Sequence, residues 1–213
     1  MKFISFIEHL LGDVIKIRVY RLLVHHPEGM TGRGLGALAR TSPFKINQVL
    51  RSLVAEGIIQ TIVVGRSHLY RLDRRHVFVQ DVILKLIDYE KNFLKNLGEG
   101  IVKRLDHQPI SVILYGSVAR GEEDTESDID LFLIYSDETL SVGPFTETRN
   151  LLSEWLTRAY GKPVSLRHCS VSDFQRLARE KDPLIRNLIK EGCAIAGSAI
   201  TEVLDYGKEN GNR

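Results

Sequence analysis

The chain has 213 residues, of which 43% are hydrophobic and 26% charged. This composition predicts a packed core and argues against wholesale disorder. No apolar run reaches the roughly 18 residues of a membrane span, so we expect a cytoplasmic protein with no membrane partner. Glu8, His9 and Asp13 interrupt the opening segment MKFISFIEHLLGD, which we interpret as a short amphipathic helix and not as a signal peptide.

The net charge of +2 conceals an uneven distribution along the chain. Residues 1–76 hold 12 Lys and Arg against 5 Asp and Glu, a net +7, so residues 77–213 hold 17 against 22, a net −5. Ordinary scatter of surface charge produces such counts as well. The alternative is that the charge counts reflect two domains with different partners. The basic first domain would suit a polyphosphate backbone, and the acidic second domain would suit divalent cations that accompany a nucleotide. Cys169 and Cys193 have no metal-binding spacing, and we interpret them as buried or half-buried thiols in a reducing cytosol.

The first half of the chain begins with helical patterns. Helical spacing of Ile15, Val19 and Leu22 predicts a helix over 13–25. A second helix is predicted over 31–40, where three glycines allow close approach of another helix or of DNA. In the third helix, Ser42 is the predicted cap and Pro43 the first residue. Its buried stripe is expected to consist of Ile46, Val49, Leu50 and Leu53, and Gly57 ends it.

A hairpin is predicted next, with strands over 58–64 and 68–72 around the turn Gly65-Arg66-Ser67. A helix, a helix-turn-helix and a hairpin follow one another in the winged-helix order. The stretch 31–76, including LRSLVAEGIIQ and GRSHLYRLDRRH, resembles the winged-helix DNA-binding family. The resemblance implies that the third helix enters the major groove and that the hairpin is a wing on the DNA backbone or minor groove.

The same resemblance implies which residues contact DNA. On the third helix they are Lys45, Asn47, Gln48 and Arg51, and on the wing they are Arg66, His68 and Arg71. A solvated polar face or a protein-binding winged helix has the same pattern. A longer helix is predicted over 79–105, with Val82, Leu86, Tyr89 and Phe93 along one side. That side either packs in a core, bridges the domains or forms a dimer interface.

Two motifs in the second half carry the chemistry. SVILYGSVARG predicts a strand over 111–115, a Gly116-Ser117 turn and a helix, and SDIDLFLIY predicts a buried strand. Asp128 and Asp130 point to one face of that strand because side chains alternate. Two carboxylates so close suit Mg²⁺ or Mn²⁺ bound together with substrate phosphates. The backbone N–H groups and hydroxyl of the turn suit phosphate oxygens.

These motifs, with DPLIRNLIKEGCAIAG near the end, resemble the nucleotidyltransferase fold of the polymerase beta superfamily, in particular its minimal members. The resemblance covers residues 110–197. It implies that Gly116 and Ser117 hold the nucleoside triphosphate and that Asp128 and Asp130 are catalytic and bind the metal. Arg120 either neutralises phosphate or pairs with Glu122 or Glu123 at the surface.

One position departs from the pattern of active relatives, which usually carry a third carboxylate on a later strand. That strand is PVSLRH here, and Ser165 occupies the place of the acid, with Arg167 next on the same face. A serine supplies no charge to a second metal, and an arginine opposes cation binding. A shifted alignment, or a carboxylate from a loop such as Asp124, Glu126 or Asp173, is the alternative.

The predicted fold class is α+β: an N-terminal winged helix-turn-helix, then a nucleotidyltransferase-like αβ domain with a small mixed sheet. We predict a winged-helix domain over 1–76, a connecting helix over 77–106, a nucleotidyltransferase-like domain over 107–200 and a tail over 201–213.

Two functions fit this organisation. The first is a DNA-binding nucleotidyltransferase that moves a nucleoside monophosphate, AMP in the first place, to a protein or nucleic-acid hydroxyl. The second is a transcriptional regulator whose degenerate transferase domain senses a nucleotide or dimerises. The resemblance also suggests an antitoxin role with a small helical toxin as partner. A homodimer would suit DNA with two half-sites.

Overall fold

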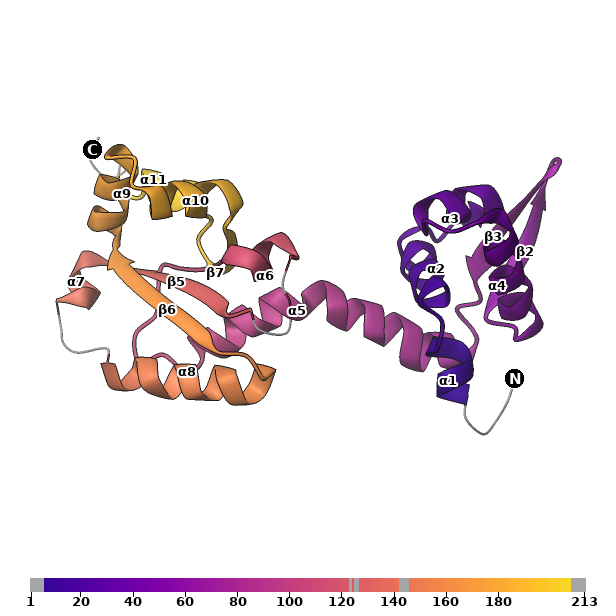
Figure 1. Ribbon diagram of the computed structural model, residues 1–213, viewed down its shortest axis with the longest axis horizontal. Helices are drawn as coiled ribbons and strands as arrows, with labels where there is room; N and C mark the ends of the chain where they lie inside the picture. The colour runs from indigo at the N-terminus through magenta and orange to yellow at the C-terminus, as the bar shows by residue number, and fades with distance from the viewer. Residues whose placement is uncertain (1–5, 123, 125–126, 142–145, 208–213) are drawn as a thin grey trace. The chain divides into compact units, whose positions relative to one another are not determined.

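The computed structural model describes residues 6–122, 124, 127–141 and 146–207 (Figure 1). The fold is α+β, with two compact units, Met1–Asn92 and Phe93–Arg213. The division falls within helix α5 (Leu84–Val102), inside the range predicted for the connecting helix. In the ranges that the structure describes, no helix is both long and apolar enough to cross a membrane.

The first unit has the predicted order of elements. It contains the helices α1 (Phe6–Leu11), α2 (Val14–His25), α3 (Gly32–Leu38) and α4 (Pro43–Ala55), and the short strand β1 (Met30–Thr31) precedes α3. Local sequence explains where the helices begin, because the side chains of Asp13, Thr31 and Ser42 accept hydrogen bonds from the free N–H groups of the next turn. The four apolar side chains predicted for α4 are all buried.

The hairpin is also confirmed, as β2 (Ile59–Val64) and β3 (Ser67–Leu72). The two strands pair in register from Ile59 opposite Leu72 to Val64 opposite Ser67, which leaves Gly65 and Arg66 as the turn. Gly65 has φ +59°, a conformation that glycine adopts without strain. With β1 on the other side of β3, the three strands form an antiparallel sheet, and the unit has the winged helix-turn-helix fold.

The buried sides of two helices include residues that helical spacing did not single out. In α2 the buried residues are Lys16, Val19, Tyr20 and Leu23, so the core side is turned toward Lys16. The long helix begins with a π-helical turn, η1 (Val79–Ile83), and its buried residues include Ile83, Ile87, Leu97 and Ile101. Of the four residues noted along one side of this helix in the sequence, Leu86 and Tyr89 are 44% and 58% exposed. Helical spacing identified both helices but not the side that the other elements cover.

The second unit is built on a four-stranded mixed sheet. The strands are β4 (Ser111–Tyr115), β5 (Ile129–Tyr135), β6 (Val164–Ser170) and β7 (Cys193–Gly197), in the order β6-β5-β4-β7. Strand β5 pairs parallel with β6 and antiparallel with β4, while β7 pairs antiparallel with β4. Strand β5 is buried along its length except at Asp130, as its apolar sequence predicts.

Helices cover both faces of this sheet (Figure 1). On one face, Leu97 and Ile101 of α5 and two leucines of α8 (Thr146–Tyr160) pack on the odd-numbered residues of β5. On the other, α9 (Val171–Arg179), α10 (Pro183–Glu191) and α11 (Ile200–Asp205) pack on Phe132 and Ile134. The short helices α6 (Gly116–Arg120) and α7 (Asp137–Leu140) follow β4 and β5. The side chain of Asp130 shares the face of α9, α10 and α11.

Two assignments made at the level of sequence need correction. Residues 201–205 were placed in a tail but belong to α11, whose Val203 is fully buried. Residues 208–213 lie outside the described residues. Both thiols are free as expected, but Cys193 is exposed and only Cys169 is partly buried.

Candidate functional site

The two aspartates lie where β5 begins. Asp128 is exposed just before the strand, and Asp130, its second residue, is half-buried. Burial raises the pKa of Asp130, and the negative charge of Asp128 raises it further. A hydrogen bond from Ser165 and the positive charge of Arg167 act in the opposite direction. Asp130 is therefore a carboxylate whose charge is costly in the protein alone and would be relieved by a bound cation.

The Gly-Ser loop lies directly against this carboxylate. Tyr115, the last residue of β4, pairs with Asp130 across the sheet, so the chain turns into α6 beside the Asp130 side chain. A Cβ on Gly116 would lie 2.2 Å from Asp130 Oδ2, and Gly116 has φ +75°. Both the space and the backbone conformation therefore require glycine, and the loop and the carboxylate form one site.

The third position of the site is occupied by Ser165. In the parallel pairing of β5 with β6, Ser165 lies opposite Asp130, and Arg167 lies opposite Phe132. The Ser165 hydroxyl interacts with Asp130 and also with Tyr115, where it partly offsets the rise in the pKa of Tyr115 caused by burial. Arg167 is exposed on the same face. A hydroxyl and a guanidinium thus stand where a third carboxylate was sought.

The loop carboxylates considered as substitutes have other partners. Asp124 accepts a hydrogen bond from the Ser127 hydroxyl at 2.8 Å, and Glu126 lies outside the described residues. Asp173, on α9, pairs with Arg176 at 2.8 Å. In the described parts of the chain, no group of three or more His, Cys, Asp or Glu residues comes together as a metal site. The acidic ligands described at this site are therefore Asp128 and Asp130.

Arg120 forms ion pairs at the surface, which is the second of the two roles considered for it. Its guanidinium contacts Glu122 at 2.7 Å and Glu191, on α10, at 3.3 Å. Glu123 lies outside the described residues. The side chains of Arg120, Glu122 and Glu191 are 40%, 65% and 30% exposed, so the two pairs contribute little to stability. Arg120 would have to leave them to bind a phosphate.

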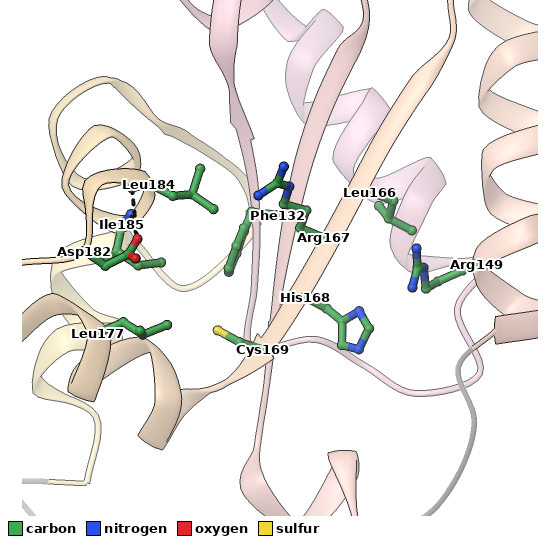
Figure 2. A pocket seen from close by; sticks show the side chains of 10 residues that line it. All are labelled: Phe132, Arg149, Leu166, Arg167, His168, Cys169, Leu177, Asp182, Leu184 and Ile185. Carbon is green, nitrogen blue, oxygen red and sulfur yellow. Dashed lines mark hydrogen bonds between the residues drawn. The ribbon is translucent and has the colours of Figure 1, made fainter. Parts of the chain in front are cut away.

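A pocket of about 520 Å³ lies along the edge strand β6 (Figure 2). Phe132, Arg167 and Cys169 line it on the side of α9 and α10, and Arg149 and His168 lie on the other side of the strand. Burial lowers the pKa of His168, as does the charge of Arg149, and burial raises the pKa of Cys169 to about 12. The carboxylate of Asp182 accepts hydrogen bonds from the first N–H groups of α10. The guanidinium groups of Arg149 and Arg167 therefore give the pocket positive charge, which suits an anionic ligand.

In the first unit, most of the residues predicted to contact DNA are exposed. Asn47, Gln48 and Arg51 are exposed on α4, as are Arg66, His68 and Arg71 on the hairpin. Lys45 differs, because its ammonium group pairs with Asp13 at 2.7 Å and holds the pKa of that carboxyl below its usual range. Arg71 donates a hydrogen bond to Gln60 at 3.3 Å. Binding of a phosphate by Lys45 would require the pair with Asp13 to break.

The sequence interpretation missed Phe44 on the same helix. Its side chain is 80% exposed, and together with Asn47, Gln48 and Arg51 it lines a surface depression of about 370 Å³. The signal was present in the sequence, because Phe44 lies outside the apolar stripe that begins at Ile46. An aromatic residue on the polar side of a helix has no place in the core of its own domain.

A family model described as Polymerase beta, Nucleotidyltransferase matches residues 99–198. These residues include the Gly-Ser loop, both aspartates and the strand with Ser165. Among curated proteins, none matches the chain. The second unit therefore contains a nucleotidyltransferase-family domain by sequence.

Several solved structures show similarity over parts of the chain. A toxin-antitoxin crystallised with AMP-PNP has 19% sequence identity and a TM-score of 0.38, over 54% of this chain and 82% of its own. A mutant of the toxin-antitoxin MntA-HpeT has 17% identity over the same shares, with a TM-score of 0.38. A MarR family transcriptional regulator from Silicibacter pomeroyi has 19% identity over 45% of this chain and 71% of its own, with a TM-score of 0.34.

Proposed function

We propose that the chain is a DNA-binding nucleotidyltransferase that moves a nucleoside monophosphate, with AMP as the first candidate, from a triphosphate to a protein or nucleic-acid hydroxyl. The observation that carries this proposal is the closeness of Gly116 to Asp130, which leaves no room for a side chain between loop and carboxylate. A triphosphate held by the loop would lie against the aspartates that bind its counter-ion. The family match over residues 99–198 supports the same chemistry.

The residues present fit one divalent cation. Two carboxylates, one of them half-buried with a raised pKa, form the kind of hard oxygen set that binds Mg²⁺ or Mn²⁺ together with substrate oxygens and water. When bound, the ion would neutralise charge on the phosphates. Asp128 and Asp130 would hold it.

In the proposed reaction, the acceptor hydroxyl oxygen forms a bond to the α-phosphorus while the bond from that phosphorus to the α–β bridging oxygen breaks. Pyrophosphate leaves with the electron pair, and the acceptor proton passes to water. The protein contributes position and charge. Backbone N–H groups at Gly116 and the hydroxyl of Ser117 bind phosphate oxygens. Arg167, on the face of Asp130, supplies the positive charge that a second cation would otherwise bring.

The pocket along β6 would receive the rest of the nucleotide. Its lining includes Phe132 and Arg167, which lie two residues beyond Asp130 and Ser165 on the same strands. Its apolar lining, which includes Leu177 and Leu184, suits the faces of a base. The exposed polar residues of α4 and of the wing would hold DNA, to which the net charge of +7 over residues 1–76 attracts the first unit.

Radiolabelled nucleotides test the transfer. The full chain is incubated with each α-labelled nucleoside triphosphate and Mg²⁺, alone, with duplex DNA, and with any small helical protein encoded beside it. We expect a labelled acceptor and released pyrophosphate. Asp130→Ala should abolish both, and Asp173→Ala, which removes an aspartate paired with Arg176, should preserve them. Label transfer that survives in the Asp130→Ala variant would refute the site.

A second function is favoured by Ser165, which supplies no third carboxylate. In this case the second unit binds a nucleotide without transferring it, and the protein is a transcriptional regulator. Its test is DNA affinity with and without each nucleotide, in the wild type and in Asp130→Ala. A nucleotide-dependent shift that Asp130→Ala removes, without label transfer, supports the sensor. An affinity that no nucleotide changes excludes it.

A further inference from the structure

The first observation concerns Phe44, the second residue of α4. At 80% it is the most exposed of the large hydrophobic side chains in the described residues; the next, Val63, is 66% exposed. The buried stripe of the same helix begins at Ile46 and holds the unit together without Phe44. An aromatic ring left in water forfeits the free energy that its burial would contribute, so its position points to a contact outside the unit.

The neighbours of Phe44 show what kind of contact it is. Asn47, Gln48 and Arg51 follow at three, four and seven residues, which places all four side chains on one side of the helix. They line the same depression. The set therefore combines one apolar ring, two amides and one guanidinium on an exposed helix side.

These groups match the edges of DNA bases in the major groove. Adenine offers an acceptor and a donor that the amide of Asn or Gln pairs with, guanine offers two acceptors to Arg, and thymine carries a methyl group that accepts apolar contact. The charge is complementary as well, because Arg33, Arg51 and Arg66 are exposed in the basic segment of the chain. A duplex is thus favoured over an apolar protein surface.

We propose that Phe44 is a specificity-determining residue of this surface and contacts the 5-methyl group of a thymine beside an adenine read by Asn47 or Gln48. The inference rests on the proposed DNA-binding function and extends it to the bases that are read. It predicts a recognition site with an A·T step at the start of α4, and it separates Phe44 from Lys45, whose ammonium is held by Asp13.

The experiment compares thymine with uracil, which differs only by the missing methyl group. The full chain selects duplexes from a random-sequence library, and its affinity for the selected duplex is measured by fluorescence anisotropy at fixed salt. Each thymine is then replaced singly by uracil. For the wild type we expect about fourfold weaker binding at one thymine, the factor that about 0.8 kcal/mol for one apolar carbon corresponds to.

Two variants test whether Phe44 causes the loss of affinity on replacing thymine by uracil. Phe44→Ala should bind the uracil and thymine duplexes equally at that position. Val77→Ala, which truncates another side chain that is 60% exposed in the same unit, should keep the difference. Because both side chains are exposed, both variants should unfold at the wild-type temperature. A Phe44→Ala variant that retains the full uracil penalty, or a wild type with no penalty at any thymine, overturns the inference while DNA binding stands. If the wild type binds neither the library nor any selected duplex, the DNA-binding function fails, and the inference with it.

Discussion

Replacing Gly116 by alanine tests how the candidate site is built. The new Cβ would lie 2.2 Å from Asp130 Oδ2, whereas the Cγ and Cβ of Asp130 would be 3.2 and 3.4 Å away. Only the carboxylate oxygen is therefore far too close, and Asp130 must rotate to make room. Gly121 provides a matched control, because it has φ +66° and a Cβ added to it would meet no described atom within 4 Å.

The two substitutions share one cost and differ in another. Both place alanine in the left-handed region, which costs about 1–2 kcal/mol. Gly116→Ala adds the displacement of Asp130 from its rotamer, about 0.5–1.5 kcal/mol. We therefore expect Gly116→Ala to be less stable than Gly121→Ala by about 1 kcal/mol, or about 4 °C in the unfolding temperature of a unit of this size.

Thermal unfolding followed by circular dichroism and titration calorimetry with Mg²⁺ and ATP provide the measurements. Gly116→Ala should weaken metal-dependent nucleotide binding about tenfold or more, since about 1.4 kcal/mol corresponds to a factor of ten. Gly121→Ala should leave it unchanged. In an Asp130→Ala background the extra instability of Gly116→Ala should disappear. Equal stability of the two single variants, with nucleotide binding intact in both, would refute the contact between Gly116 and Asp130.

Three further predictions concern charges. The pKa of Asp130 is higher in the folded state than in the unfolded state, so ionisation of Asp130 destabilises the fold at pH values above the folded-state pKa. Below the unfolded-state pKa the carboxyl is protonated in both states, and this cost is absent. Asp130→Asn should therefore raise the unfolding temperature at pH 7 and lose this advantage as the pH falls toward 4. Thermal scans without metal across that pH range would contradict this if the variant were never more stable. Ser165→Asp should tighten Mn²⁺ binding about tenfold by calorimetry, because a third carboxylate adds charge to the site; unchanged affinity would mean that position 165 does not face the metal. If Arg66 contacts one phosphate, Arg66→Ala should reduce the slope of log K against log salt for DNA binding by about 0.9. Arg75 is paired with Asp73, so Arg75→Ala should leave that slope unchanged.

Local sequence predicted the elements that begin and end with a strong chemical signal. Ser42 and Pro43 start α4 because a hydroxyl satisfies the free N–H of Lys45 and proline suits the first turn. The hairpin around Gly65 and the strand ending at Tyr115 were predicted for similar reasons, since a glycine turn and a short apolar run act over a few residues. Polar spacing also identified the exposed side of α4, although Phe44 was overlooked there.

Contacts between distant segments could not be predicted in the same way. The pairing of Arg120 with Glu191 joins residues 71 positions apart, and nothing near Arg120 in sequence indicates it. Helical spacing alone does not decide which side of α5 is buried, and only the covering elements leave Leu86 44% exposed and Ile87 4% exposed. Lys16 is buried since its amine reaches the backbone oxygen of His9, in a different helix.

The amino-acid sequence by itself determined the α+β class, the order of the elements, and the two motifs that hold Gly116 and the aspartates, because these depend on spacing within one or two elements. Only the tertiary structure decided that the Gly116 backbone lies against the Asp130 carboxylate and that Arg120 pairs with Glu191 on α10. Each of these depends on strand pairing or on packing between segments separated in the chain. Such contacts are specified by the whole core and by no local run of residues.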